Sequence, residues 1–441
     1  NEYPLFIQAL AITKMGAAVA NRELDLLTEE QTDAILRACK EILEGKHHEQ
    51  FPVDMIQGGA GTTTNMNINE VIANRAIEIL GGRKGDYSIV HPNDHVNMAQ
   101  STNDVIPCAG KLTMMGLLPR LIEELERLQK AFSDKAVEFD DVVKMGRTQL
   151  QDAVPIRLGQ SFEAYANVVG RDISRLKGLK KDLRALNIGA TAVGTAINVN
   201  PVYLFQIIKN INLICGTDCY QADDLFDATQ NLDCFVHVSG ALKTCASSLS
   251  KICNDLRLLS SGPHAGLGEI NLPPKQNGSS IMPGKINPVI PEVVSQVAFN
   301  VIGNDVTVTM AAEAGQLELN AFEPVIFYKI FESIDTLGGA VTTLIDNCVL
   351  GITANRDRCR RLVESSSALA TALCPSLGYK LSAEIAKKAL STGTPVRQIV
   401  LEEGLMTQEQ LDRCLNLKDM TQPGHLVEYR KIGAGKSEKT E

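Results

Sequence analysis

The stretch VSGALKTCASSLSKICNDLRLL, residues 238–259, repeats its apolar side chains at a helical spacing. Seven of them follow one another in steps that alternate between four and three residues: Val238, Leu242, Cys245, Leu249, Ile252, Leu256 and Leu259. This alternation places all seven on one face of an α-helix. A seam of this length predicts a helix that packs lengthwise against others, as in a bundle. We therefore expect its cysteine to be part of the core.

Three further stretches carry seams of the same kind. They are Leu118, Leu121, Ile122, Leu125, Leu128 and Phe132; Phe162, Ala166, Val169, Ile173, Leu176 and Leu183; and Ile330, Ile334, Leu337, Val341 and Leu344. The period-two alternation of strands is scarce between them. We therefore predict an all-α fold with a central bundle of long helices.

The regions outside this bundle have a different pattern. Residues 1–100 mix helical stretches with turns and include an expected helix over 28–43. Past about residue 355 the pattern is one of short helices, and Thr407 and Gln410 have the spacing of a capping box. Residues 433–441 are rich in Gly, Lys, Ser and Glu, and we expect them to fray. We predict three domains, over residues 1–100, 101–355 and 356–441.

Composition excludes several classes of function. The 441-residue chain has a formal net charge of −9 and no basic stripe, so we expect no nucleic-acid partner. We expect no signal peptide, and the sequence has no uninterrupted apolar run of the roughly 18 residues that a membrane helix needs. We therefore expect no membrane partner. Eleven cysteines without a CxxC pair are typical of reduced thiols in a cytoplasm, and we predict no metal site.

A polar loop follows the main seam. Its sequence, GSSIMPGKINPVIP at residues 278–291, combines two hydroxyls, a Pro-Gly turn, a lysine and an asparagine. Such a composition predicts an exposed loop. A hydroxyl from Ser279 beside Lys285 and Asn287 suits a site that takes an acidic proton from an anionic substrate. A solvated loop without function has the same composition, so both interpretations stay open on these residues alone.

Three more polar segments interrupt the apolar pattern: GTTTNMN at 61–67, QSTND at 100–104 and GRTQLQDAVP at 146–155. The first lacks the Gly-Lys-Ser/Thr of a P-loop, although its hydroxyls could bind a carboxylate. The second is a helix N-cap signal, and the amides and hydroxyls of a helix N-terminus also suit an anion.

These three segments and the loop resemble, in order, the signature segments of the aspartase/fumarase superfamily. The resemblance covers nearly the whole chain. It implies a three-domain homotetramer in which long helices of four subunits form one bundle core, and each active site gathers segments from three subunits. Members of the superfamily carry further residues before the position that matches Asn1, so we expect the sequence to be truncated at its start.

The resemblance also implies roles for individual residues. Ser279 matches the catalytic base, which takes a proton from the carbon next to a carboxylate. The donors that stabilise the resulting aci-carboxylate match Thr62, Ser101, Thr102 and Ser280. The residues that hold the second carboxylate match Thr148, Lys285 and Asn287. Asn103 lies where it could meet the leaving group, and Glu292 matches a carboxylate that orients the equivalent of Gln149.

Four differences within the superfamily favour aspartate over malate as the substrate. Fumarases have serine where this chain has Ala60 and Thr102, have histidine at Gln149, and lack the Phe-Glu-Pro-Val found at 322–325. Glutamine cannot titrate, and the expulsion of hydroxide from malate needs a proton donor more than the expulsion of ammonia does. We predict a carbon–nitrogen lyase that interconverts L-aspartate with fumarate and ammonia. A class II fumarase and a non-catalytic member of the superfamily stay as alternatives.

Two further expectations follow from the resemblance. No organic cofactor is required, and a divalent metal such as Mg²⁺ is an optional activator. The segment His91-Pro92-Asn93-Asp94 resembles a second anion site of fumarases, but it also has the composition of a turn with a side-chain cap.

Overall fold

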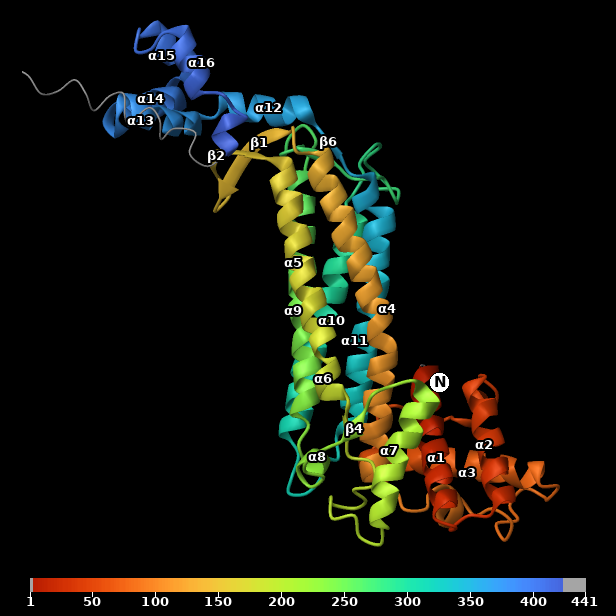
Figure 1. The fold of residues 1–441 in the computed structure, drawn as a ribbon. Coiled ribbons are helices and arrows are strands. Elements are labelled where there is room, and N and C mark those ends of the chain that lie inside the picture. The colour runs from red at the N-terminus through yellow and green to blue at the C-terminus, as the bar shows by residue number, and fades with distance from the viewer. Residues whose placement is uncertain (1–2, 423–441) are drawn as a thin grey trace, which may run out of the picture. The chain divides into compact units, whose positions relative to one another are not determined.

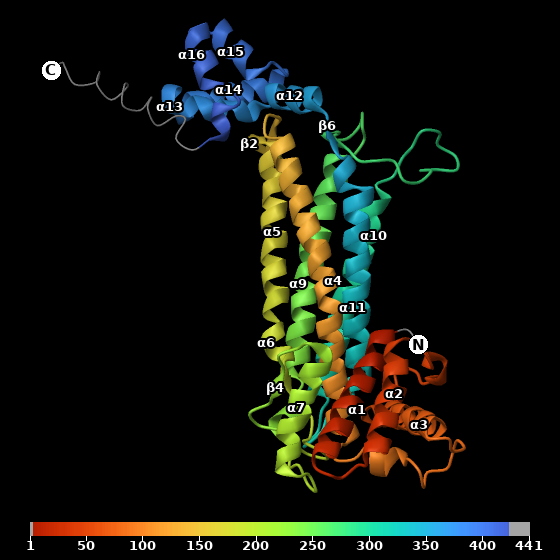
Figure 2. The ribbon, with the colours of Figure 1, turned by 45° about the vertical axis from the view of Figure 1, so that its right-hand side comes forward.

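The structure is a computed structural model that describes residues 3–422, drawn in Figures 1 and 2. The chain separates into two compact units. The first comprises residues 3–125, Arg171–Leu249 and Ser295–Val341; the second comprises Glu126–Gly170, Ser250–Val294 and residues 342–422. The three domains expected from the sequence stay a prediction, and the expected fraying of 433–441 falls outside the described residues.

Five long helices each contribute a segment to both units: α4 (Thr102–Glu138), α5 (Leu158–Gly178), α9 (Asp233–Leu259), α10 (Val289–Glu313) and α11 (Glu323–Asn347). Both views show the segments of these helices running side by side within a unit (Figures 1 and 2). The helical fold predicted from the apolar seams is confirmed.

The seam of α9 is buried as its spacing predicts. Six of its seven members, from Val238 to Leu256, are at most 1 % exposed, and Leu259 at the end is half-buried. The α11 seam from Ile330 to Leu344 is equally buried. Polar contacts also connect these helices: for example, Asp305 of α10 accepts hydrogen bonds from Ser239 and Lys243 of α9 at 2.8 and 2.6 Å. Burial along the seam holds these helix segments together.

Helix α4 is long and apolar enough to cross a membrane by length and composition alone. Yet 67 % of its most apolar 18-residue window is buried inside the protein. Burial of this kind is typical of a core helix.

The first unit also contains helices from its first two segments, residues 3–125 and Arg171–Leu249. They are α1 (Pro4–Glu23), α2 (Glu29–Leu43), α3 (Thr62–Ile79), α6 (Lys180–Leu183), α7 (Pro201–Cys215) and α8 (Asp227–Gln230), with the short helices η1 (His48–Gln50), η2 (Gly59–Gly61) and η3 (Pro92–Val96). Strands β3 (Ala185–Leu186) and β4 (Tyr220–Gln221) pair in parallel. Thr28 and Gln31 form a capping box, which explains why the helix expected over 28–43 begins there.

The second unit contains the remaining strands and the C-terminal helices. Strand β1 (Val143–Thr148) pairs with β2 (Gln151–Arg157), and β5 (Ile270–Asn271) pairs with β6 (Thr353–Ala354), both antiparallel. The other elements are η4 (Val349–Gly351), α12 (Arg356–Ser365), η5 (Ser367–Leu373), α13 (Cys374–Leu377), α14 (Tyr379–Thr392), α15 (Val396–Glu402), α16 (Gln408–Cys414) and η6 (Asp419–Thr421).

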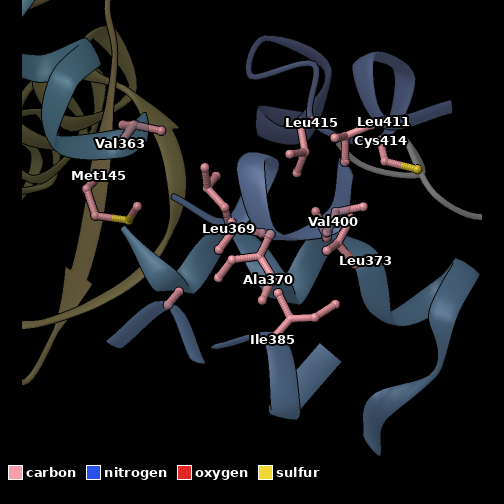
Figure 3. Packing of buried hydrophobic residues seen from close by; sticks show 14 residues of the cluster. Met145, Val363, Leu369, Ala370, Leu373, Ile385, Val400, Leu411, Cys414 and Leu415 are labelled. Carbon is pink, nitrogen blue, oxygen red and sulfur yellow. The ribbon is translucent and has the colours of Figure 1, made fainter. Parts of the chain in front are cut away.

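A hydrophobic cluster joins these C-terminal helices to the β1–β2 hairpin. Met145 of β1 and Val363 of α12 belong to it, together with Leu369, Leu373 and Ile385 (Figure 3). The capping box expected at Thr407 and Gln410 is present at the start of α16. The cluster therefore provides a packed base for the hairpin, on which two of the expected site residues lie.

Candidate active site

The segment Ser101 to Asn103 forms the start of α4. The hydroxyl of Ser101 accepts a hydrogen bond from the backbone N–H of Asn103 at 3.3 Å, so the predicted N-cap is present. The hydroxyl of Thr102 accepts one from the Asn65 amide of α3 at 3.3 Å. Two of the expected aci-carboxylate donors are thus fixed next to the free N–H groups of a helix N-terminus, which attract an anion.

A buried lysine supports this segment from behind. Lys14 of α1 is fully buried, and its ammonium donates to the Oδ1 atoms of Asn65 and Asn97, each at 2.8 Å. Burial lowers the pKa of Lys14 to about 7, although the charge of Asp104 opposes this shift. Because Asn65 also donates to Thr102, Lys14 fixes the amide that orients this hydroxyl.

Asp104 connects the same segment to the polar loop after residue 188. Its carboxylate accepts the N–H groups of Ser101, Gly189 and Thr191 at 3.0, 3.0 and 2.9 Å. Burial raises the pKa of Asp104 to about 7, against the opposing effect of these donors and of Lys14. The side chain of Asn103 contacts the same loop, since its amide donates to the Ala192 carbonyl at 2.7 Å.

Thr62 begins α3, and its surroundings are set by the backbone. The three residues before it, 59–61, all have positive φ, between 57° and 88°. Its hydroxyl donates to the Gly59 carbonyl at 2.7 Å and is exposed. The structure therefore places a third expected donor at a helix N-terminus of the first unit.

Thr148 and Gln149 lie at the tip of the β1–β2 hairpin, in the second unit. Thr148 pairs with Gln151, and the two residues between them, Gln149 and Leu150, have φ of 54° and 63°. Turns of this type normally use Asn or Gly, so a Gln-Leu pair holds backbone strain at a position expected to contact substrate.

An ion-pair cluster anchors the base of this hairpin. Glu269 is fully buried; its carboxylate accepts a hydrogen bond from Arg147 at 2.9 Å and lies 3.2 Å from the ammonium of Lys144. Both cations belong to β1, the strand that ends at Thr148. The three charges thus fix the strand that leads to the expected substrate residues.

Two hydrogen bonds, one from a side chain and one from the backbone, close the loop at residues 278–291. The Asn287 amide donates to the Gly278 carbonyl at 2.8 Å, and the N–H of Lys285 donates to the Met282 carbonyl at 3.2 Å. A Cβ atom on Gly278 would lie 1.6 Å from the carbonyl oxygen of Lys285, so only glycine fits there. Residues 280–286 are exposed, as the sequence predicts.

Ser279 lies inside this closed loop. Its hydroxyl oxygen accepts hydrogen bonds from the N–H groups of Ile281 and Met282 at 3.3 and 3.0 Å. Two donors aimed at one oxygen stabilise negative charge on that oxygen. This geometry suits a serine that must lose its proton to act as a base.

The remaining expected residues of the second unit have few partners. Lys285 and Ser280 are exposed, and within residues 3–422 their side chains make no hydrogen bond or ion pair. Glu292 at the start of α10 lies 3.9 Å from the guanidinium of Arg257, and no hydrogen bond connects it to Gln149 among the described residues. The side chains of Lys285 and Ser280 are therefore available to a ligand.

The expected site residues thus fall into two groups. Thr62, Ser101, Thr102 and Asn103 belong to the first unit; Thr148, Gln149, Ser279, Ser280, Lys285, Asn287 and Glu292 belong to the second. Sequence reasoning missed the buried supports, Lys14, Asp104 and Glu269. The only signal for Lys14 is a lone cation within the apolar stretch of α1.

The segment His91-Pro92-Asn93-Asp94 has two open interpretations, a capped turn and a second anion site. Its Nδ1 atom accepts the N–H groups of Asn93 and Asp94, each at 3.1 Å, so the side chain caps η3. The capped turn is therefore present, and the second anion site stays a prediction.

The fold and these segments define a class of enzyme. A family model described as Lyase matches residues 4–303, and one described as Fumarase C C-terminus matches residues 369–422. The chain belongs to this lyase family, the aspartase/fumarase superfamily.

Individual relatives of high sequence identity are aspartate ammonia-lyases. An aspartate ammonia-lyase of Bacillus subtilis (strain 168) is 53 % identical over 418 residues, which cover 95 % of this chain and 88 % of the relative. One of Helicobacter pylori (strain J99) is 54 % identical over 421 residues, 96 % and 90 % of the two chains.

Solved structures of the superfamily have the same fold. The cobalt-bound fumarate lyase:delta crystallin of Brucella melitensis superposes with a TM-score of 0.94 at 52 % identity, over 96 % of this chain and 92 % of that one. A class II fumarase of Schistosoma mansoni gives 0.91 at 34 % identity, over 96 % and 91 %.

Proposed function

We propose that this chain interconverts L-aspartate with fumarate and ammonia, with Ser279 as the base. The observation that carries the role of Ser279 is the pair of backbone N–H groups at its hydroxyl oxygen. The aspartate ammonia-lyases that are more than half identical to the chain support the choice of reaction.

In this reaction Ser279 takes a proton from the substrate carbon that lies β to the amine. This carbon and the carboxylate next to it then form an aci-carboxylate. Thr62, Ser101, Thr102 and Ser280 donate to that dianion, while Thr148, Lys285 and Asn287 hold the other carboxylate. The C–N bond then breaks, ammonia leaves with the electron pair next to Asn103, and the C=C bond of fumarate forms. Glu292 orients Gln149, and no step needs a proton from Gln149 because ammonia leaves more readily than hydroxide.

The test is the formation of fumarate, followed by its ultraviolet absorbance, with L-aspartate and L-malate offered separately. Turnover of aspartate alone is expected. Turnover of malate alone would overturn the reaction and favour a fumarase, and turnover of neither would favour a non-catalytic member of the superfamily.

We also propose that the active species is a homotetramer. The supporting feature is the outer face of α10, where Phe299, Val306 and Met310 recur at seven and four residues and are 62, 55 and 66 % exposed. An apolar stripe of this length on a helix suits packing against helices of other subunits. Light scattering after gel filtration should give a tetramer. Phe299→Glu should give smaller, inactive species, and an unchanged tetramer would contradict this assignment.

Two further parts of the proposal concern the environment. No organic cofactor takes part, and Mg²⁺ is at most an activator, so turnover should persist in EDTA. The protein acts in the cytoplasm, which suits its eleven cysteines, all free thiols. Complete loss of activity in EDTA, restored by Mg²⁺, would contradict the first part.

A further inference from the structure

The second unit contains a basic pocket that shares no lining residue with the candidate active site. Its volume is about 1120 Å³. The lining comes from His264 in the loop after α9, from α12 and η5, from Pro395 and Arg397 at the start of α15, and from residues that follow α16. A cavity of this size accommodates a small organic molecule.

Charge is the first unusual property of the basic pocket. Four arginines line the pocket: Arg358, Arg360, Arg361 and Arg397. The lining contains a single acidic residue, Glu364, although the net charge of the whole chain is −9. Arg360 pairs with Glu364 at 2.7 Å, and Arg397 pairs with Asp412. Arg358 and Arg361 therefore have no carboxylate partner within the described residues.

Arg358 is held in place for a further contact. Its Nε and Nη2 atoms donate to the carbonyls of Leu267 and Gly266 at 3.0 and 2.9 Å, and the side chain is half-buried. Its Nη1 group makes no hydrogen bond within residues 3–422. A guanidinium held by two carbonyls in this way still presents the N–H groups of Nη1, which can donate to an oxygen of a carboxylate or a phosphate.

An apolar wall is the second unusual property. Leu362, Leu369, Leu415 and Leu417 line the same pocket. Leu369 and Leu415 are also members of the hydrophobic cluster drawn in Figure 3, so this wall is part of the packed base of the unit. A purely electrostatic surface for inorganic ions would not need such a wall.

We propose that the basic pocket binds a small organic polyanion. Arg358 and Arg361 hold its anionic groups, and the leucine wall contacts its apolar part. The anionic groups are phosphates or carboxylates, since both accept the paired donors of a guanidinium. This site is independent of the reaction proposed above.

The test is isothermal titration of the full chain at about 50 mM salt with three probes, ATP, citrate and inorganic tripolyphosphate. We expect ATP or citrate to bind once per chain with a Kd below about 1 mM. The tighter of the two identifies phosphate or carboxylate as the anionic group. Tripolyphosphate should bind at least about fivefold more weakly than the better organic probe, because it cannot use the leucine wall.

Variants locate the binding. Arg361→Gln should weaken binding at least about fivefold with kcat unchanged, because the exposed side chain contributes charge but no fold contact. Arg358→Gln should weaken it further, and Arg37→Gln, an exposed arginine of α2, should change nothing. Absence of binding by both organic probes, equal binding by tripolyphosphate, or parental affinity in Arg361→Gln would each overturn the proposal.

Discussion

The two groups of candidate site residues are held in opposite ways. Around Ser101 and Thr102, the supports are buried and come from distant parts of the sequence, with Lys14 and Asp104 at the centre. Around Ser279, the hydrogen bonds come from the loop itself, and the side chains at the tip are exposed. The first group is therefore coupled to the stability of its unit, whereas the loop determines its own geometry. Substitutions in the loop should therefore change activity without changing stability, whereas substitutions at the start of α4 should change both.

The largest effect is expected from Ser279→Ala. Loss of a general base should lower kcat for aspartate by about 10³-fold, within the range that such groups contribute. The melting temperature should stay within about 1 °C, because substitutions of side chains without buried partners seldom change stability much. Fumarate absorbance and thermal melting measure the two quantities.

Ser391→Ala, at an exposed serine of α14, is the matched control and should leave both quantities unchanged. A Ser279→Ala protein that retained turnover would remove Ser279 from its proposed role. One that lost several degrees of melting temperature would break the contrast between the loop and the start of α4.

Lys14→Met should change both stability and activity. The variant leaves the buried Oδ1 atom of Asn65 without its donor, while the Oδ1 atom of Asn97 keeps only the hydrogen bond from the Asn65 amide at 3.3 Å. We expect a cost of about 1–3 kcal/mol. We expect the melting temperature to fall by several degrees, and KM for aspartate to rise because Thr102 loses its orientation. Lys40→Met, at an exposed lysine of α2, controls for the lost charge. A stable variant with unchanged KM would show that Lys14 does not position the site.

The sequence predicts the features that local patterns encode. The four-three spacing of Val238 to Leu256 predicts a buried helix, and the Gly, Pro and Ser content of 278–291 predicts an exposed loop. Lys14 has no such pattern, because its partners Asn65 and Asn97 are 51 and 83 residues away. Arg147 and Glu269 are 122 residues apart. Contacts of this range depend on the packing of whole helices, which spacing alone does not reveal.

Asp104, a buried support of the first group, should make the stability of the protein depend on pH. Burial raises the pKa of this carboxyl from 3.8 to about 7, so between these values the folded state binds a proton that the unfolded state does not. Its contribution to stability is therefore complete below pH 3.8 and is lost as the pH rises through about 7. Asp104→Asn abolishes this titration. The melting temperature of the parent minus that of the variant should be smaller at about pH 7.5 than at about pH 5.

Asp335→Asn, at an exposed carboxylate of α11, is the matched control for the change from aspartate to asparagine. A difference at Asp104 that grew with pH would mean that the carboxylate is more stable ionised in the folded protein. The three N–H donors and Lys14 would then outweigh burial.

The smallest effect is expected at the tip of the β1–β2 hairpin. This tip is held neither by buried side chains from distant parts of the sequence nor by hydrogen bonds within the loop at 278–291. Leu150 has φ of 63° and is 69 % exposed, so its strain is held by the hairpin and not by packing of its side chain. The left-handed conformation costs a residue with a Cβ about 1–2 kcal/mol, and part of this is offset when glycine increases the entropy of the unfolded chain. Leu150→Gly should therefore raise the melting temperature by about 1 °C with kcat unchanged. Leu150→Ala keeps the Cβ and the strain, and should not raise it. If both variants shifted the melting temperature equally, the effect would come from the exposed leucine side chain and not from the backbone that holds Gln149.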